Sequence, residues 1–315
     1  MTVGDGFRAE LWASGFDGPT QMVFAPSGDL LVAELNGGEN EELGSVVRVS
    51  ADDLEDRVVL QTGLDKPTGI AVAGDLLWIM ERQRLSVTTL EPDAAREVVL
   101  DNMPFNGRSQ GTLTVTPDGR LIFDTSGSKR GPDRVDGSGT LFAIEDAAQG
   151  AGETTVIATG FKHAYAHVVD ESGQLWSVEM TDGVFDDERA SDELLAIDPG
   201  DDAGWPQCVD DNRPVVEFGG TEELCRASPR SHALFGTGAT PTSLVVTPWD
   251  SNSFIVALWV SGEVVTVPVS ASPDGPHEPE LFIEGIETPQ HLLVDGDGVL
   301  LSEHGSGRII RISAT

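Results

Sequence analysis

The sequence has few of the residues that mark nucleic-acid-binding proteins. Only 19 of its 315 residues are Lys or Arg, against 53 Asp or Glu, so the formal net charge is -34. So negative a chain repels nucleic acid and anionic membrane surfaces, and we expect neither as a partner. Three lysines in so acidic a chain are typical of proteins from high-salt organisms, where screening makes the self-repulsion tolerable. An ordinary acidic secreted protein is the alternative.

Long hydrophobic runs and cysteine clusters are also missing. No run of about 18 apolar residues occurs, so we expect no membrane insertion. The start, "MTVGDGFRAELWASGF", has no basic segment followed by an apolar core, so no signal peptide is visible. The two cysteines, Cys208 and Cys225, have no CxxC or His pair nearby, which favours one disulfide over a zinc site. A disulfide favours an extracellular or cell-surface location with the leader removed; the cytoplasm is the alternative.

Helical periodicity is almost absent, and a β-hairpin pattern recurs in its place. Each copy has a Gly and often a Pro, a short β-rich run, a turn such as Pro-Asp-Gly, and a second apolar run. "GFDGPTQMVFAPSGDLLVAE" and "GLDKPTGIAVAGDLLWIME" are the first two. The six copies span 15–34, 63–81, 110–127, 160–180, 238–258 and 285–304.

Further strand-like runs between the copies give about four strands per unit of about 50 residues. This predicts an all-β fold, a six-bladed β-propeller formed by residues 1–315 as a single domain. The strand "FRAELWAS" has no blade of its own, and we expect it to close the ring beside the last blade. Residues 181–235 exceed the blade spacing and predict a loop insertion. Within it, "DELLAIDPGDDAGWPQC" (192–208) is too polar to be expected in the core.

Acids and histidines recur at strand ends that should face the central channel. Four repeats end their second strand with a glutamate, and Asp124 lies near this place in the third repeat. These residues are Glu34, Glu81, Glu179 and Glu303, and the histidines that join them are His163, His167, His291 and His304. Such a set could form a metal site or perform acid–base chemistry. Alternatively, it lines a water-filled channel and hydrogen-bonds neighbouring backbones.

The segments after the fourth repeat carry a family resemblance. "GFKHAY", "QLWSVE", "DELLAI" and "DAGWP" follow in order, and cysteines occur in "GWPQC" and "LCRASP". This pattern resembles the soluble quinoprotein glucose and sorbosone dehydrogenases, six-bladed propellers that bind pyrroloquinoline quinone (PQQ). The resemblance extends over essentially the whole chain, and these segments are its specific part.

The resemblance implies a structural calcium site. In the family an Asp-Glu pair binds calcium together with the carbonyl before Gly-Trp-Pro, which maps onto Asp192, Glu193 and the carbonyl of Ala203. Calcium prefers six to eight hard oxygen ligands, so these groups suit it. The alternative is that Asp192 caps a turn and Trp205 fills a seam between blades.

The resemblance also implies a catalytic site, in which several positions differ. Where the family has its catalytic His, this chain has Arg108, Ser109 and Gln110, and the Arg-Asn that contacts the quinone is Lys162 and His163. The Gly-Pro whose carbonyls hold the cofactor's calcium falls near residues 181–182. We therefore expect Lys162 and Arg108 to face the quinone. His163 or His167 would be the substitute base.

Three hypotheses follow from these patterns. The first is a PQQ-dependent oxidoreductase acting on a sugar or other alcohol or aldehyde. The second is a metal-dependent propeller hydrolase or lyase that uses the channel acids and histidines, because "DGDGVLLSEHGSGRIIRI" also resembles streptogramin lyase repeats. The third is a non-catalytic propeller that binds a carbohydrate or a protein. The sequence does not indicate an oligomeric state.

Overall fold

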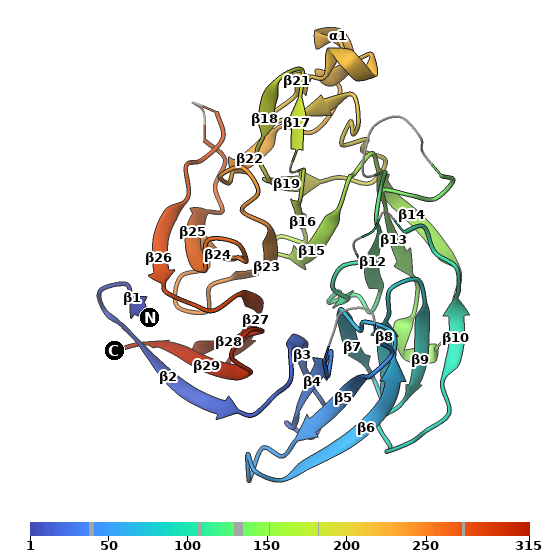
Figure 1. Ribbon diagram of the computed structural model, residues 1–315, viewed down its shortest axis with the longest axis vertical. Helices are drawn as coiled ribbons and strands as arrows, with labels where there is room; N and C mark the ends of the chain where they lie inside the picture. The colour runs from blue at the N-terminus through green and yellow to red at the C-terminus, as the bar shows by residue number, and fades with distance from the viewer. Residues whose placement is uncertain are drawn as a thin grey trace.

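The chain forms a ring of six antiparallel sheets (Figure 1), as the repeats predicted. The computed structural model describes residues 1–37, 41–105, 107, 109–128, 135–150, 152–181, 183–272 and 275–315. None of the helices in these ranges is long and apolar enough to cross a membrane.

Each blade contains four consecutive strands or nearly so. Blades 1 and 2 contain β3 (Pro19–Phe24), β4 (Leu30–Glu34), β5 (Gly44–Val49) and β6 (Arg57–Leu64), then β7 (Gly69–Ala73), β8 (Leu76–Met80), β9 (Leu85–Thr89) and β10 (Glu97–Leu100). Blades 3 and 4 contain β11 (Thr114–Val115), β12 (Leu121–Thr125), β13 (Thr140–Ile144) and β14 (Thr154–Thr159), then β15 (Ala164–Val169), β16 (Leu175–Glu179), β19 (Glu193–Ile197) and β22 (Ser231–Leu234). Blades 5 and 6 contain β23 (Pro241–Val246), β24 (Ser253–Leu258), β25 (Glu263–Pro268) and β26 (Glu280–Glu284), then β27 (Pro289–Asp295), β28 (Gly298–Glu303) and β29 (Arg308–Ala314).

The N-terminal segment supplies the outer strands that complete the ring. Strand β2 (Phe7–Ser14) pairs antiparallel with β29, which confirms the predicted closure of the last blade. Strand β1 (Thr2–Val3) pairs with β26 and adds a fifth strand to blade 5, which the sequence did not predict. The first residues of the chain therefore join two blades made from its last third.

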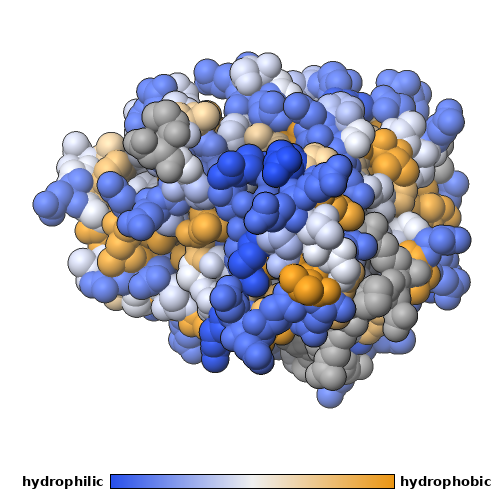
Figure 2. Space-filling model, turned by 90° about the horizontal axis from the view of Figure 1, so that it is seen from above, coloured by the Kyte–Doolittle hydropathy of each residue, from blue (hydrophilic) through white to orange (hydrophobic). Residues whose placement is uncertain are grey.

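The insertion projects from blade 4, at the top of Figure 1. Its elements are β17 (Gly183–Phe185), β18 (Glu188–Ala190), β20 (Cys208–Val209), β21 (Arg213–Pro214), the 3-10 turn Val216–Phe218 and helix α1 (Glu222–Cys225); a second 3-10 turn, Ala147–Gln149, lies in blade 3. The predicted disulfide between Cys208 and Cys225 is present. Seen from the insertion's side, hydrophilic residues cover most of the surface (Figure 2), in keeping with the charge of -34.

The expectation that residues 192–208 form a polar loop outside the core is wrong for their first part. Residues 193–197 form β19, the third strand of blade 4, and Asp192 is fully buried. Neighbouring blades cover the inner strands on both faces, so these strands lack the alternation of polar and apolar residues that marks a half-buried strand. The hydrogen bonds that Asp192 and Glu193 accept offset part of the free-energy cost of burying these two acids.

Glycines at the start of the third strand let consecutive blades approach closely. Phe161, Ile286 and Phe16 each donate a backbone hydrogen bond to such a glycine in the preceding blade. The acceptors are Gly139, Gly262 and Gly307, all with positive φ. A Cβ on Gly307 would lie 2.0 Å from the carbonyl oxygen of Phe16, so no larger residue fits without opening the seam between blades 6 and 1.

We expect Gly307→Ala to destabilise the protein by roughly 3 kcal/mol, because it combines a steric clash with a positive φ. Gly119→Ala is the matched control: Gly119 has φ of 87° but nothing within 4 Å of its added Cβ, so its cost should be about 1 kcal/mol. Urea unfolding of both variants measures the difference. Equal losses would mean that the close approach at Gly307 does not hold the seam.

Candidate functional site

A pocket lies where all six blades converge on the axis of the ring, and we call it the axial pocket. Its volume is about 230 Å³. It is lined by Thr20, Leu35, Lys66, Thr68, Gly107, Ser109, His163, Tyr165, Met180, Thr240, Thr242, Trp259, Gln290 and His304. Because each blade contributes only two or three of these residues, the pocket exists only in the closed ring.

Hydroxyl groups dominate the polar lining of the axial pocket. Thr68 Oγ1 and Ser109 Oγ are buried and have no hydrogen-bond partner among the described residues. Buried polar atoms are nearly always paired, so these hydroxyls are suited to a ligand. No acid is among the described lining residues, and only Lys66, His163 and His304 among them can carry a positive charge.

His163 is backed by a buried acid from the neighbouring blade. Asp124 Oδ1 accepts a 2.5 Å hydrogen bond from the backbone N–H of Gly111. Its Oδ2 accepts no hydrogen bond within the described part of the chain and lies 3.9 Å from Nε2 of His163. Burial raises the pKa of Asp124 to about 8. The histidine predicted as a substitute base therefore lines the pocket with a carboxyl group behind it.

The other three histidines of the predicted channel set fall into two groups. His167 and His291 are buried away from the pocket lining, and burial lowers the pKa of each to about 3, which keeps both neutral. His304 lines the pocket, and its ring centroid lies 4.9 Å from that of Trp259. Trp259, which the sequence favoured as a packing residue over one that faces the channel, also lines the pocket. Its one signal was its place directly after the second strand of blade 5, close to where other repeats carry an acid.

The repeated glutamates have an architectural role. Each accepts a hydrogen bond from the backbone of the loop that leads into its own blade. The donors are Asp17 for Glu34, Asp65 for Glu81, Lys162 for Glu179 and Glu287 for Glu303, at 2.9, 2.8, 2.6 and 3.2 Å. This arrangement matches the alternative interpretation of these acids, in which they hydrogen-bond neighbouring backbone groups.

These acids do not gather around one point. Across the ranges that the structure describes, no three His, Cys, Asp or Glu side chains are placed to hold a metal ion together. The alternative metal site predicted from Glu34, Glu81, Glu179, His291, Glu303 and His304 is thus not assembled by those side chains. The sequence showed the repetition but not the direction of each carboxylate.

The second strand of blade 5 has Leu258 where other blades have glutamate. Asp192, from blade 4, accepts the corresponding backbone hydrogen bond in blade 5. Its Oδ2 accepts a 2.7 Å hydrogen bond from the N–H of Thr240, in the loop that leads into blade 5. Its own carbonyl accepts from Phe235. The carboxylate predicted as a calcium ligand is therefore directed to the next blade.

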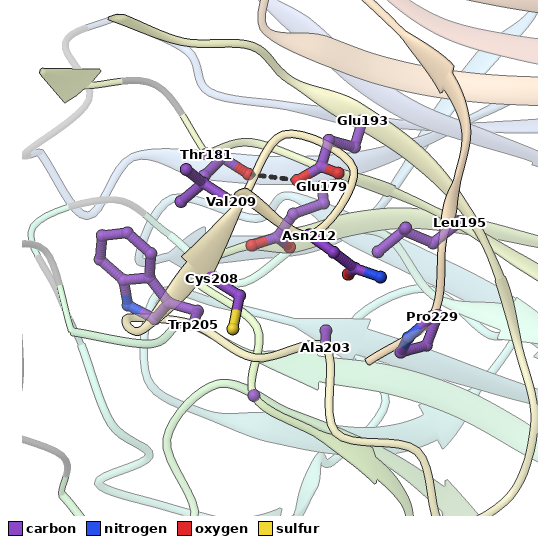
Figure 3. A pocket seen from close by; sticks show the side chains of 11 residues that line it. Glu179, Thr181, Glu193, Leu195, Ala203, Trp205, Cys208, Val209, Asn212 and Pro229 are labelled. Carbon is purple, nitrogen blue, oxygen red and sulfur yellow. Dashed lines mark hydrogen bonds between the residues drawn. The ribbon is translucent and has the colours of Figure 1, made fainter. Parts of the chain in front are cut away.

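A second, smaller cavity holds the other predicted calcium ligands, and we call it the acid cavity. It has room for about one water or ion, about 10 Å³. Glu193 and Ala203, two of the residues predicted as calcium ligands, line it together with Glu179, Thr181 and Asn212 (Figure 3). Glu193 accepts hydrogen bonds from Ser231 Oγ and from the N–H of Asp211, and its Oε2 lies 3.4 Å from Thr181 Oγ1.

The two carboxyl groups of the acid cavity are costly to ionise. Burial, together with the nearby charge of Glu193, raises the pKa of Glu179 to about 8. Burial also raises the pKa of Glu193. Two buried carboxylates, with a carbonyl and an amide nearby, form an oxygen-rich site of the kind a hard divalent cation prefers.

Of the two residues predicted to face a quinone, only Lys162 is among the described residues. Lys162 is absent from the axial pocket lining, and its Nζ donates to the carbonyl of Thr181 at 3.2 Å. Arg108 lies outside the described residues, although Gly107 and Ser109 on either side line the pocket.

Gln110 belongs to the segment in which the sequence resemblance led us to expect a catalytic His. Its Nε2 donates to the carbonyls of Arg82 and Pro104, and its Oε1 accepts from Ser126. This buried amide ties three segments together, so the position is structural in this chain.

No family model matches the sequence, and no curated protein matches it. Solved structures do match over the whole chain. A calcium structure of a family AA12 carbohydrate-active enzyme from Trichoderma reesei has a TM-score of 0.85 at 16% identity, covering 100% of this chain and 97% of that one.

Two further neighbours are the PQQ domain of one dehydrogenase and the PQQ-bound form of another. The holo form of the PQQ domain of pyranose dehydrogenase from Coprinopsis cinerea has a TM-score of 0.79 at 14% identity, covering 99% and 96% of the two chains. The PQQ-bound aldose sugar dehydrogenase from Streptomyces coelicolor has a TM-score of 0.76 at 19% identity and full coverage of both. The chain therefore has the six-bladed propeller fold of the soluble PQQ-dependent sugar dehydrogenases and of the AA12 enzyme, as its sequence resemblance predicted.

Proposed function

We propose that this protein is an oxidoreductase of the soluble quinoprotein type that oxidises a sugar, or another alcohol or aldehyde, in the axial pocket. The observation that carries the proposal is the pocket itself: buried hydroxyls of Thr68 and Ser109 with no partner among the described residues, and His163 backed by Asp124. PQQ-bound and holo neighbours with the same fold support it.

The pocket residues fit a small, planar, polar cofactor such as PQQ. The hydroxyls of Thr68 and Ser109 can donate to its oxygens, Lys66 can face a carboxylate, and Trp259 offers an aromatic surface. The pocket's volume of about 230 Å³ is of the size of one such molecule. When bound, the quinone supplies the two-electron acceptor.

His163 is the residue we assign as the base. Its Nε2 faces Asp124, so its Nδ1 would take the proton of the substrate hydroxyl. Where Asp124 is ionised, above its pKa of about 8, its carboxylate 3.9 Å away would stabilise the imidazolium formed in this way. His167, the other candidate, does not line the pocket.

We also propose that the acid cavity binds calcium through Glu193, Glu179 and the carbonyl of Ala203. The support is the oxygen-rich lining and the raised pKa of both carboxyl groups. A cation there would compensate two buried charges and would stabilise the fold.

A non-catalytic carbohydrate-binding propeller is the second candidate. It is favoured by the structural amide of Gln110, in the segment where the resemblance implied a catalytic His, and by the scarcity of cations in the described pocket lining. A pocket of hydroxyls and aromatic rings also suits a sugar. The hydrolase hypothesis has no comparable support.

Titration calorimetry of chelator-treated protein with PQQ and calcium at molar salt tests the proposal. We expect micromolar or tighter binding, weakened roughly 10-fold by Lys66→Met, which removes a charge from the pocket. Sugar binding without quinone binding would establish the second candidate. Failure to bind either would refute both.

His163→Gln should lower kcat for sugar oxidation by roughly 100-fold or more, because glutamine cannot accept the proton. Quinone affinity should stay within a few-fold of wild type. His167→Gln is the comparison, because the sequence left both histidines open as the base. A larger loss of kcat in His167→Gln than in His163→Gln would reverse the assignment.

Asp124→Asn should flatten the dependence of stability on pH. The folded pKa of about 8 exceeds the ordinary 3.8, so wild type loses stability as pH rises from about 4 to 8, and the loss is absent below that window. Each unit of raised pKa corresponds to about 1.4 kcal/mol. Urea unfolding near pH 5 and near pH 8, at fixed high salt, should show the variant gaining on wild type at the higher pH. Parallel curves would mean that Asp124 does not carry this penalty.

A further inference from the structure

Two histidines meet where blade 4 adjoins blade 5. His232 lies in β22, the outer strand of blade 4, and His277 lies in the connection between β25 and β26 of blade 5. Their ring centroids are 4.9 Å apart, and both residues are partly buried. Neither is among the described residues that line the axial pocket or the acid cavity. The pair is therefore separate from the sites of the proposed function.

Backbone pairing joins the two blades at this point. The N–H of His277 donates to the carbonyl of His232 at 2.7 Å, and the N–H of Leu234 donates to the carbonyl of His277 at 3.4 Å. Ala233 and His277 form a parallel bridge. His232 is the extra residue of a bulge where β22 pairs with β19, and bulges often redirect a side chain. We call this pairing of β22 with His277 the blade 4–5 clasp.

The hydrogen bonds of the two rings identify their neutral tautomers. His232 Nε2 lies 2.7 Å from the carbonyl oxygen of Pro268, and His277 Nε2 lies 2.8 Å from that of Ser270. A carbonyl oxygen can only accept, so both rings carry their proton on Nε2. Nδ1 is then the atom of each ring that takes a second proton. Both rings are held by the same short segment, 268–270.

The surroundings of His232 favour its neutral form. Burial lowers the pKa of His232, the carbonyl of Pro268 raises it, and a charge on His277 lowers it. The ring also packs against two uncharged aromatic rings, those of Trp176 at 4.7 Å and Phe254 at 6.4 Å between centroids. A positive charge on His232 is therefore costly where the ring lies.

Other charged residues lie on or beside the elements around the pair. They are Asp170, Glu193, Arg230, Glu278 and Glu280. The first three have partners, which are Trp176, Ser231 and Asp211, and the two glutamates are exposed. Among the charges of the described residues, that of His277 is the one that acts on the pKa of His232. Protonation of one ring therefore opposes protonation of the other.

We propose that His232 and His277 make the blade 4–5 clasp sensitive to acid. While the rings are neutral, the backbone and ring hydrogen bonds keep the clasp closed. When each ring takes a proton from solvent on Nδ1, two positive charges lie 4.9 Å apart, and their repulsion opens the pairing of β22 with His277. At molar salt the screening length is about 3 Å, but a partly buried pair is screened less than an exposed one.

Hydrogen exchange of the metal-free protein without quinone, at molar potassium chloride, tests the proposal. Between about pH 7 and about pH 5, the protection factors of the His277 and Leu234 amides should fall by roughly ten-fold or more, because protonation of both rings opens the clasp. Lowering the salt concentration should enlarge this fall.

Amides of the β24–β25 ladder are the internal control and should keep their protection within about two-fold. They are needed because His167 and His291 also destabilise the protein in acid: the pKa of each is about 3 in the fold, so stability falls as the pH drops below the ordinary value of about 6.5. That effect acts on the whole fold, whereas opening of the clasp is local.

His277→Gln is the matched variant, because glutamine can still donate to the carbonyl of Ser270 but takes no proton. In this variant the clasp should keep its protection in acid, and the NMR titration midpoint of His232 should rise. His277→Glu places a negative charge beside His232, so acid should increase the protection of the clasp. Should these variants fail to fold, His232→Gln gives the same comparison from blade 4.

An equal fall in protection in wild type and His277→Gln would overturn the proposal, because the second charge would then have no part in the opening. Unchanged protection of the wild-type clasp between the two pH values would also overturn it, as would an equal fall in the β24–β25 ladder. Because the experiment contains neither quinone nor metal, a failure of the proposed function would leave its result intact.

Discussion

The antiparallel pairing of β2 with β29 is the contact on which the rest of the structure depends. Each blade buries both faces against its neighbours, so an open ring would expose the apolar faces of two blades. The pairing joins the start of the chain to its end, and β1 reinforces it on blade 5. Only a closed ring brings residues from six blades together around the axial pocket.

The same geometry explains why so many acids are buried near the axis. A carboxylate at the end of the second strand accepts hydrogen bonds from the loop leading into its blade, which offsets part of its desolvation cost. Pocket residues such as Thr20, Thr68 and His163 follow these loops in the chain. The acids therefore position the site without taking part in it.

The acid cavity is where this repeated arrangement departs from its pattern. Glu179 belongs to the repeated set, but in blade 4 the third strand places Glu193 opposite it, and the insertion covers both. Burial raises the pKa of both carboxyl groups, so they are costly to ionise where they lie. A metal ion bound between them would offset that cost.

The sequence by itself determined the hairpins, their sixfold repetition, the closing strand and the disulfide. These follow from local rules: turn residues, short β-rich runs and the spacing of repeats. These rules did not predict that β19 is buried, because a strand covered on both faces has no alternating pattern of polar and apolar residues. Tertiary structure alone decided that Asp192 turns to Thr240, that Trp259 lines the axial pocket, that Asp124 lies behind His163 and that the Lys162 ammonium donates to the carbonyl of Thr181. Such directions depend on the contacts between blades and with the insertion, which join residues far apart in the chain, and no local pattern records them.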